Sequence, residues 1–184
     1  FESDDLELLA AIDLLKNWNL RTDFDNRVAA LAILTFPLEF DISKYKHDVD
    51  KITKNLKESI LKLKSSFGRF DVPLGEVQRL IRGDVSYPLD GGPGNMRAIY
   101  SKWEDGKMVA KVGDCYVQIV EWSPEGKVSA QSIHQFGSST NDQNSKFFKN
   151  QSKLFSEKKM KQVWSTIEDI KNNLYSSYNV TSHK

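Results

Sequence analysis

The clearest pattern along this chain of 184 residues is a single apolar stripe over residues 44–67. The stripe recurs at steps of three or four residues, between charged and polar positions, and consists of Tyr45, Val49, Ile52, Leu56, Ile60, Leu63 and Phe67. This spacing predicts a long amphipathic helix that ends at Gly68. The ordinary interpretation is a surface helix packed on its own domain, and the functional alternative is a helix that binds a partner.

Two more helices are expected before this stripe. Residues 5–18 carry apolar side chains at helical spacing, and Ser3 or Asp4 can cap the first turn. Residues 25–36 are apolar on nearly every side, so this helix should be buried on nearly every side and should end at Pro37. Such a helix needs covering elements around it.

The pattern becomes extended in the middle of the chain. A short helix is expected over residues 74–82, ended by Gly83, and a loop rich in glycine and proline follows it. Two β-hairpins then follow, with strands over 98–103 and 107–112 and over 115–122 and 127–136. In the second hairpin we expect three apolar side chains to be buried: Val117, Ile119 and Ile133.

Two helices are expected to close the chain, over residues 145–155 and 158–174. The order of helices, hairpins and helices predicts an α+β fold, with helices at both ends flanking two antiparallel hairpins. We therefore treat residues 1–184 as one domain or fragment. Its parts are a helical part (1–83), a hairpin part (84–137) and a second helical part (138–178).

Composition narrows the function classes. The chain is 39% hydrophobic and 28% charged with a net charge of +1, which is a globular balance and gives no overall reason to expect nucleic acid or a membrane as partner. A single cysteine, Cys115, excludes an internal disulfide. The chain starts at Phe1 rather than at a methionine, which leads us to expect that sequence is missing upstream.

The residues suggest two candidate sites, one catalytic and one for phosphate binding, and the pattern around each favours a structural role instead. Cys115 and His134 could act as nucleophile and base, with Asp114 as the orienting group, but a strand cysteine beside Tyr116 and Val117 is more often an inert small apolar residue. The Gly91-Gly92-Pro93-Gly94 loop could cradle a phosphate, but it lacks the Lys-Ser/Thr of a P-loop. A tight loop with positive φ angles is the better interpretation.

The histidines and lysines give no stronger candidate. His47, His134 and His183 are far apart and have no second ligand at metal spacing, so no metal site is expected. A lysine cluster interleaved with aromatic residues could suggest nucleic-acid binding, although such runs usually form a solvated helix face. The cluster is Lys146, Lys149, Lys153, Lys158, Lys159 and Lys161, interleaved with Phe147, Phe148 and Trp164.

Three stretches carry a family resemblance. The first is Leu14-Leu15-Lys16-Asn17-Trp18-Asn19, followed by Asp25 and Ala29-Ala30-Leu31. The second is Val72-Pro73-Leu74-Gly75-Glu76-Val77-Gln78-Arg79-Leu80, followed by Pro88-Leu89-Asp90-Gly91-Gly92-Pro93-Gly94. The third is Gly113–Val120 and Gly137-Ser138-Ser139-Thr140-Asn141-Asp142, with Ser145, Phe148 and Gln151 beyond it. In order and spacing they resemble the penicillin acylase family, in its branch of acyl-homoserine-lactone and aculeacin acylases.

The resemblance runs from about residue 10 to about residue 165, with a poorly matching insert near 40–67. The chain departs from the family pattern at four positions, where Leu74 stands for Trp, Asp142 for Pro, Phe147 for His and Asn150 for Asp. These departures bear on substrate similarity more than on the fold.

The resemblance implies a layered αββα architecture and an amide hydrolase whose precursor cuts itself. The nucleophile of such an enzyme is a new N-terminal serine, and its own α-amine is the base. Phe1 has no hydroxyl or thiol, and the family's catalytic positions precede the matched stretch. We therefore assign no catalytic, cofactor-binding or metal-binding residue, and we expect this chain to be the C-terminal part of the large chain.

The same resemblance implies the partners. These are the remainder of the precursor and, for the whole enzyme, a small-molecule amide such as an acyl-homoserine lactone or a penicillin. It also implies a periplasmic or secreted location. The alternative is a stand-alone α+β module that binds a protein through the 44–67 helix or the lysine cluster. A stand-alone module should bury its own 25–36 helix, whereas an excised piece should leave apolar surface uncovered.

Overall fold

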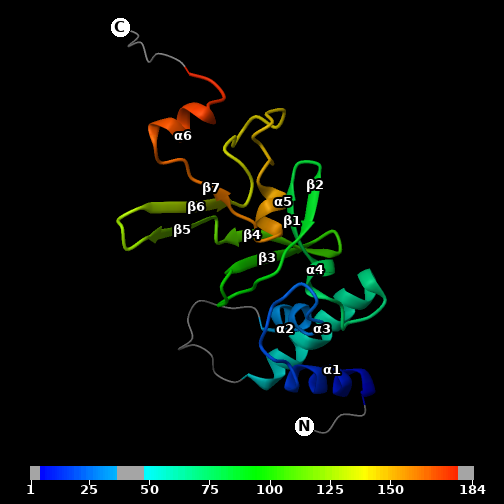
Figure 1. Cartoon of the computed structure of the whole chain (residues 1–184). Helices are drawn as coiled ribbons and strands as arrows, with labels where there is room; N and C mark the ends of the chain where they lie inside the picture. Colours follow the sequence, from blue (N-terminus) through cyan, green and yellow to red (C-terminus); the bar gives the residue numbers. More distant parts are fainter. Residues whose placement is uncertain (1–4, 37–47, 178–184) are drawn as a thin grey trace.

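The computed structural model describes residues 5–36 and 48–177 (Figure 1). Three helices form the N-terminal end: α1 (Leu6–Lys16), α2 (Ala29–Thr35) and α3 (Val49–Phe67). The side chain of Asp5 caps α1 by accepting a hydrogen bond from the N–H of Leu8 at 3.1 Å. The caps expected from the sequence, Ser3 and Asp4, lie outside the described residues.

The long helix α3 confirms the apolar stripe. Its N-terminus is capped by Asp48, which accepts from the N–H of Lys51, and it ends at Gly68 with a φ of 74°. Leu56, Ile60 and Leu63 are buried, whereas Val49 at the first turn is exposed. Tyr45 lies outside the described residues. The helix therefore packs on its own domain, as the ordinary interpretation predicts.

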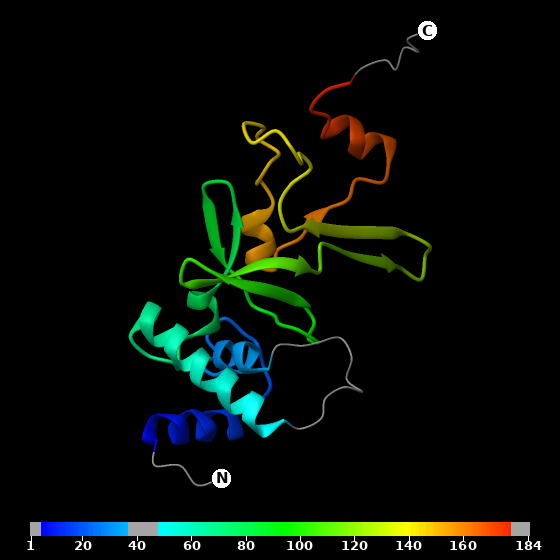
Figure 2. The same cartoon turned by 180° about the vertical axis from the view of Figure 1, so that it is seen from behind.

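The buried helix α2 is shorter than expected. It begins after Asn26, whose side-chain oxygen accepts from the N–H groups of Val28 and Ala29 at 3.0 and 2.9 Å. All but two of its residues are buried, because α1, α3 and α4 surround it (Figure 2). Pro37, its expected end, lies outside the described residues. Almost complete burial was predicted correctly, and this chain supplies the covering elements itself.

A four-stranded sheet follows, with the strand order β2-β1-β4-β3. It consists of β1 (Gln78–Arg82), β2 (Val85–Pro88), β3 (Ile99–Glu104) and β4 (Lys107–Gly113), preceded by the single turn α4 (Leu74–Val77). The predicted hairpin β3–β4 is confirmed. The helix predicted over 74–82 is wrong beyond Val77, because β1 pairs with β2 on one side and with β4 on the other.

The second sheet contains three strands in the order β5-β6-β7. Its strands are β5 (Tyr116–Trp122), β6 (Val128–His134) and β7 (Lys161–Gln162). The predicted hairpin β5–β6 is confirmed with an uninterrupted register. It projects sideways from the rest of the molecule in both views (Figures 1 and 2). This explains why Ile133 is buried and Val117 half-buried, while Ile119 is 50% exposed and was wrongly predicted as buried.

The C-terminal helices are much shorter than expected. They are α5 (Ser152–Ser156) and α6 (Ile167–Asn172), so helices over 145–155 and 158–174 are wrong in most of their length. The reason is tertiary hydrogen bonding. The N–H of Gln151 donates to the carbonyl of Phe136 at 2.7 Å, and that of Ser139 to the carbonyl of Phe147 at 3.1 Å. These backbone groups bind the segment after β6 instead of forming a helix.

The molecule has two apolar cores. One lies among α1, α2, α3, α4 and β4, and the other lies where β1 and β3 meet β6 and α5, around Phe155. Mixed helices and mainly antiparallel strands confirm the α+β class. The parallel pair β1–β4 is the exception.

Candidate functional site

The glycine-rich loop after β2 is held by hydrogen bonds to distant parts of the chain. Gly91 and Gly94 have positive φ angles of 87° and 75°, as the sequence predicts. The N–H of Gly91 donates to Thr22, and that of Gly92 donates to Arg97. Because these donors are already used inside the protein, the loop offers no N–H cradle for a phosphate.

A fully buried glutamine holds this loop in place. The side-chain amide of Gln78 donates to the carbonyls of Leu89 and Gly91 at 3.1 and 3.0 Å, and its oxygen accepts from the hydroxyl of Ser101 at 2.9 Å. Gln78 lies on β1, in a segment for which the sequence predicts a helix. The role of Gln78 in holding the loop was therefore missed in the sequence analysis. A strand prediction for this segment would have placed Gln78 beside the loop and could have indicated this role.

A buried charge cluster fastens the same loop to the C-terminal part of the chain. The carboxylate of Asp90 pairs with Arg97 and Lys158, and its side chain is only 5% exposed. The guanidinium of Arg97 also donates to the carbonyl of Phe155 and lies 4.6 Å from the centre of that ring. Because the charged groups of the cluster pair with one another, the arrangement is suited to holding the loop in position rather than to chemistry on a substrate.

The structure separates the roles proposed for Asp114, Cys115 and His134. Asp114 accepts a hydrogen bond from the N–H of Ala98 at 2.9 Å and donates its own N–H to the carbonyl of Ala98, so it is bound to the residue that precedes β3. The ring of His134 contacts the edge of Tyr116 at 4.9 Å between centroids. Cys115 is exposed. No hydrogen bond joins these side chains within the described residues, which does not support a thiol enzyme.

Four of the six lysines of the cluster form ion pairs. Lys149 pairs with Asp84, Lys158 with Asp90, and Lys153 and Lys159 both with Glu157. The hydrogen bond from Lys159 is the main cause that lowers the pKa of Glu157, and the one from Lys149 lowers that of Asp84. Because four of the lysines are engaged in ion pairs and Lys146 lies over the rings of Phe147 and Tyr175, the structure does not favour a nucleic-acid site here.

Metal and membrane features can be judged only on part of the chain. Over residues 5–36 and 48–177, no group of three or more His, Cys, Asp or Glu side chains could hold a metal ion. His47 and His183 lie outside these ranges. Within the same ranges no helix has the length and apolar character needed to cross a membrane.

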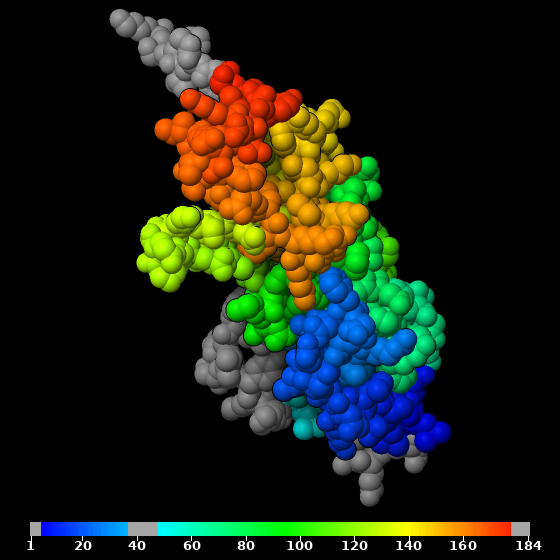
Figure 3. All heavy atoms as spheres, viewed as in Figure 1, coloured from blue at the N-terminus to red at the C-terminus, as the bar shows by residue number. Residues whose placement is uncertain are grey.

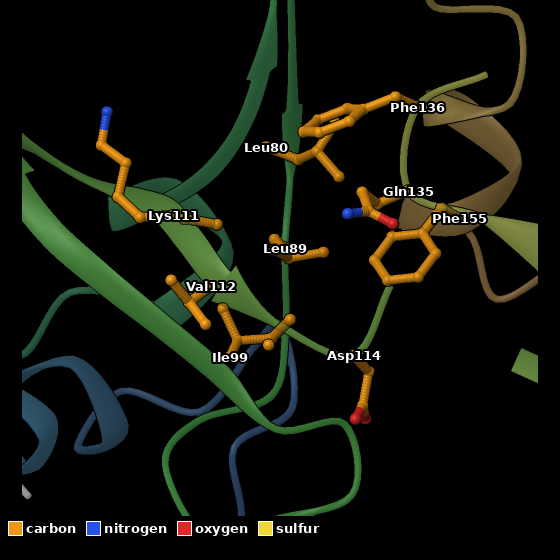
Figure 4. A pocket seen from close by; sticks show the side chains of 11 residues that line it. Leu80, Leu89, Ile99, Lys111, Val112, Asp114, Gln135, Phe136 and Phe155 are labelled. Atoms are coloured by element: carbon orange, nitrogen blue, oxygen red, sulfur yellow. The ribbon is translucent and has the colours of Figure 1, made fainter. Parts of the chain in front are cut away.

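A small apolar pocket of about 40 Å³ lies between the two sheets. Figure 4 shows Leu80, Leu89 and Ile99 on one side of it and Phe136 and Phe155 on the other. The rest of its lining comes from the end of β4 and the residues after it, Ala110 to Asp114, and from Gln135. With this volume and lining the pocket holds at most a small apolar group, and it contains no hydroxyl or thiol nucleophile.

Two larger open grooves lie elsewhere on the surface that the structure describes. One, of about 630 Å³, is lined by charged residues and Phe24, and it includes Arg79, whose pKa is lowered by burial. The guanidinium of Arg79 donates to the carbonyls of Gly75 and Ser86, so it serves the fold. The other groove, also about 630 Å³, lies between the second sheet and α6 and is rich in aromatic side chains: Tyr116, Trp164 and Tyr175.

The comparisons with known proteins place these features in a family. The penicillin amidase family profile matches residues 2–172. A similar solved structure is a thermostable penicillin G acylase from Alcaligenes faecalis, with 16% identity and a TM-score of 0.35; the match covers 85% of this chain and 28% of that one. No curated protein matches the sequence significantly. Because the family profile spans nearly the whole sequence, this chain belongs to the penicillin amidase family.

Proposed function

We propose that this chain is the C-terminal, structural portion of the large chain of an amide hydrolase. The observation that carries the proposal is the family match over residues 2–172. The chain covers only 28% of the penicillin G acylase chain that it matches. Activity, substrate and partners of the whole enzyme are accordingly part of the proposal.

In the proposed enzyme the reaction takes place on another part of the polypeptide. An N-terminal serine attacks the carbonyl carbon of a linear amide, and its α-amine accepts the hydroxyl proton and passes it to the leaving amine. Backbone N–H groups and an asparagine hold the negative oxygen. The present chain contributes a rigid support, in which Gln78 and the Asp90–Arg97 pair fix the glycine-rich loop against β1 and α5.

The proposed substrates are linear amides of the acyl-homoserine-lactone or penicillin type. The proposed partners are the small chain and the N-terminal part of the large chain, in a periplasmic or secreted enzyme that processes itself and adopts the layered αββα architecture. This proposal follows the branch of the family that the sequence motifs resemble.

The stand-alone module is the weaker candidate. Its criterion, burial of the 25–36 helix within this chain, is met by α2. The criterion for a piece is also met, since the β5–β6 hairpin exposes Ile119, Trp122 and Val128. Family membership favours the enzyme portion, because the remainder of such an enzyme would supply a partner for the uncovered surface.

The test compares this chain with the complete polypeptide that carries it. The 184-residue chain alone should hydrolyse neither acyl-homoserine lactones nor chromogenic anilides, because it lacks an N-terminal nucleophile. The complete polypeptide should yield a large chain with an N-terminal serine, seen by mass spectrometry, and should hydrolyse such an amide. Turnover by the 184-residue chain that Cys115→Ala abolishes, with Cys115→Ser as the matched control, would contradict the proposal.

A further inference from the structure

The edge strands of the two sheets are unequally protected. Four described strands lie at edges, namely β2, β3, β5 and β7. An edge strand exposes backbone N–H and C=O groups, and proteins protect such edges by short length, proline, lysine or a bulge. Strand β2 has four residues and ends in Pro88, and β7 has only two residues, including Lys161. Strand β3 contains Lys102 and a register shift between Tyr100 and Ser101.

Strand β5 has none of these protective features. It is seven residues long, Tyr116–Trp122, and contains no proline, lysine or arginine. Its pairing with β6 is regular from end to end. Its one charge, Glu121, accepts a hydrogen bond at 3.3 Å from the hydroxyl of Ser129 on the neighbouring strand. Among the edges that the structure describes, β5 is therefore the one built to be paired.

The register identifies the backbone groups that face outward. The N–H of Ser123 donates to the carbonyl of Lys127, so in the regular antiparallel ladder the odd-numbered residues of β5 are bonded to β6. On the other side of β6, the N–H of Val163 donates to the carbonyl of Ala130, which is consistent with this alternation. The N–H and C=O groups of Gln118, Val120 and Trp122 therefore point to the free edge.

The faces beside this edge are apolar as well. Ile119 is 50% exposed on one face, and the cross-strand pair Trp122 and Val128 is 70% and 49% exposed on the other. Figure 3 shows the hairpin projecting from the body. An apolar surface on both sides of an unpaired edge requires a partner that supplies a strand and also layers above and below it.

We propose that a β-strand from the remainder of the enzyme's own polypeptide pairs with the free edge of β5 and extends the β5–β6–β7 sheet. This inference rests on the proposed function, and it names which edge of this chain joins the rest of the enzyme. A second copy of this chain is the poorer occupant. Edge-to-edge pairing of two such hairpins about a two-fold axis would satisfy the β5 backbone but would leave Ile119 and Trp122 exposed on its faces.

Residue-resolved hydrogen–deuterium exchange on the complete, processed polypeptide and on the 184-residue chain tests the pairing. In the 184-residue chain the amides of Gln118, Val120 and Trp122 should exchange freely, whereas in the complete enzyme they should slow by about 100-fold or more. The amides of Ile119 and Glu121 face β6 and should be protected in both, which makes them internal controls for a folded hairpin.

A matched pair of variants at one residue tests the same contact. Val120→Pro removes one outward N–H and leaves the bonds to β6 in place, because proline is tolerated at such an edge position. Val120→Thr keeps both the N–H and the β-branch. In the complete polypeptide, Val120→Pro should lower the yield of processed, soluble enzyme several-fold relative to Val120→Thr, while the two 184-residue variants should have equal melting midpoints.

The outcomes separate this inference from the proposed function. Free exchange of the three outward amides in a folded, active enzyme would overturn the strand pairing and leave the function intact. Protected amides in a polypeptide without amidase activity would support the pairing and contradict the function. A 184-residue chain that dimerises, protects these amides itself and becomes monomeric on Val120→Pro would assign the edge to a second copy and overturn the proposed occupant.

Discussion

Replacing Asp90 with alanine is expected to be among the most destabilising single changes in this chain. The carboxylate is only 5% exposed and pairs with Arg97, whose side chain is 12% exposed, and with Lys158, which is 53% exposed. Removing one member of a buried pair leaves an uncompensated buried charge and costs about 3–5 kcal/mol. Arg97 keeps its hydrogen bond to the carbonyl of Phe155 and its contact with that ring. We therefore expect the lower end, about 3 kcal/mol.

This free energy is large on the scale of the whole fold. In a chain of this length each kcal/mol shifts the melting midpoint by about 2–4 °C, so Asp90→Ala should lower it by about 6–12 °C. Lys158→Met is the matched control. It removes the solvent-exposed partner of the same carboxylate and should cost less than about 1 kcal/mol, because exposed pairs contribute little.

A double variant isolates the charge from the packing. Asp90→Ala with Arg97→Met leaves no unpaired buried charge, because the remaining partner, Lys158, is 53% exposed, so it should recover about 2 kcal/mol of the loss expected from adding the two single variants. Guanidinium unfolding, followed by the fluorescence of the four tryptophans and by circular dichroism, measures the unchanged chain, the Asp90, Arg97 and Lys158 single variants and the double variant. If Asp90→Ala costs less than about 1 kcal/mol, or if the two changes simply add, the cluster does not act as a buried pair and this reasoning fails.

Three further predictions concern backbone, burial and pH. Gly91→Ala should lower the free energy of unfolding by about 2 kcal/mol more than Gly126→Ala, because both have a positive φ but only at Gly91 would the new Cβ lie 2.5 Å from the carbonyl of Arg97; equal losses in chemical denaturation would contradict this. Ile133 is 4% exposed, so Ile133→Asp should unfold the chain or cost about 3 kcal/mol or more. Ile119 lies on the same face of the hairpin but is 50% exposed, so Ile119→Asp should change the melting midpoint of the 184-residue chain little. Similar melting curves for the two variants would refute the burial assignment. The free energy of unfolding should fall as the pH drops below about 4, because the hydrogen bond from Arg69 lowers the pKa of Asp71 in the folded chain. The stability that this ion pair contributes is complete above the pKa of Asp71 in the unfolded chain and is lost as the pH falls through its pKa in the folded chain. The melting midpoint of Asp71→Asn should therefore depend less on pH in that range, and an unchanged slope would show that the pair is not responsible.

Several elements could be predicted from the sequence because their signals are local. The stripe of α3 lies on one face at helical spacing, and Gly68 ends that helix with a positive φ. The Asp105-Gly106 and Pro-Glu-Gly turns each join two strands of matching length. In these cases the neighbours that decide the conformation are a few residues away along the chain, so composition and periodicity contain the answer. The order of the three motif stretches also indicated the family, which the profile match shows.

The strand β1 depended on the tertiary structure. The segment after Pro73 has good helix formers, and Gly83 was interpreted as a helix end, although Gly83-Asp84 is also a two-residue hairpin turn. Pairing with β2 and β4 outweighs the local preference, because it satisfies the backbone on both sides and buries Gln78 against the glycine-rich loop. The same holds for residues 145–151, where the N–H of Gln151 donates to the carbonyl of Phe136 and the carbonyl of Phe147 accepts from the N–H of Ser139, so this segment is bound to the one after β6.

The charge cluster shows most clearly what the sequence alone left open. Asp90 was visible only as one residue of a glycine-rich motif, Arg97 as a residue of the following segment, and Lys158 as one of six clustered lysines. They meet because β1 and β2 place the loop against α5, more than 50 residues further along the chain. Burying the carboxylate of Asp90 removes its hydration, and the positive charges of Arg97 and Lys158 compensate this loss. Because Lys158 lies on a distant segment, only the packing of the whole fold decides whether the three groups meet.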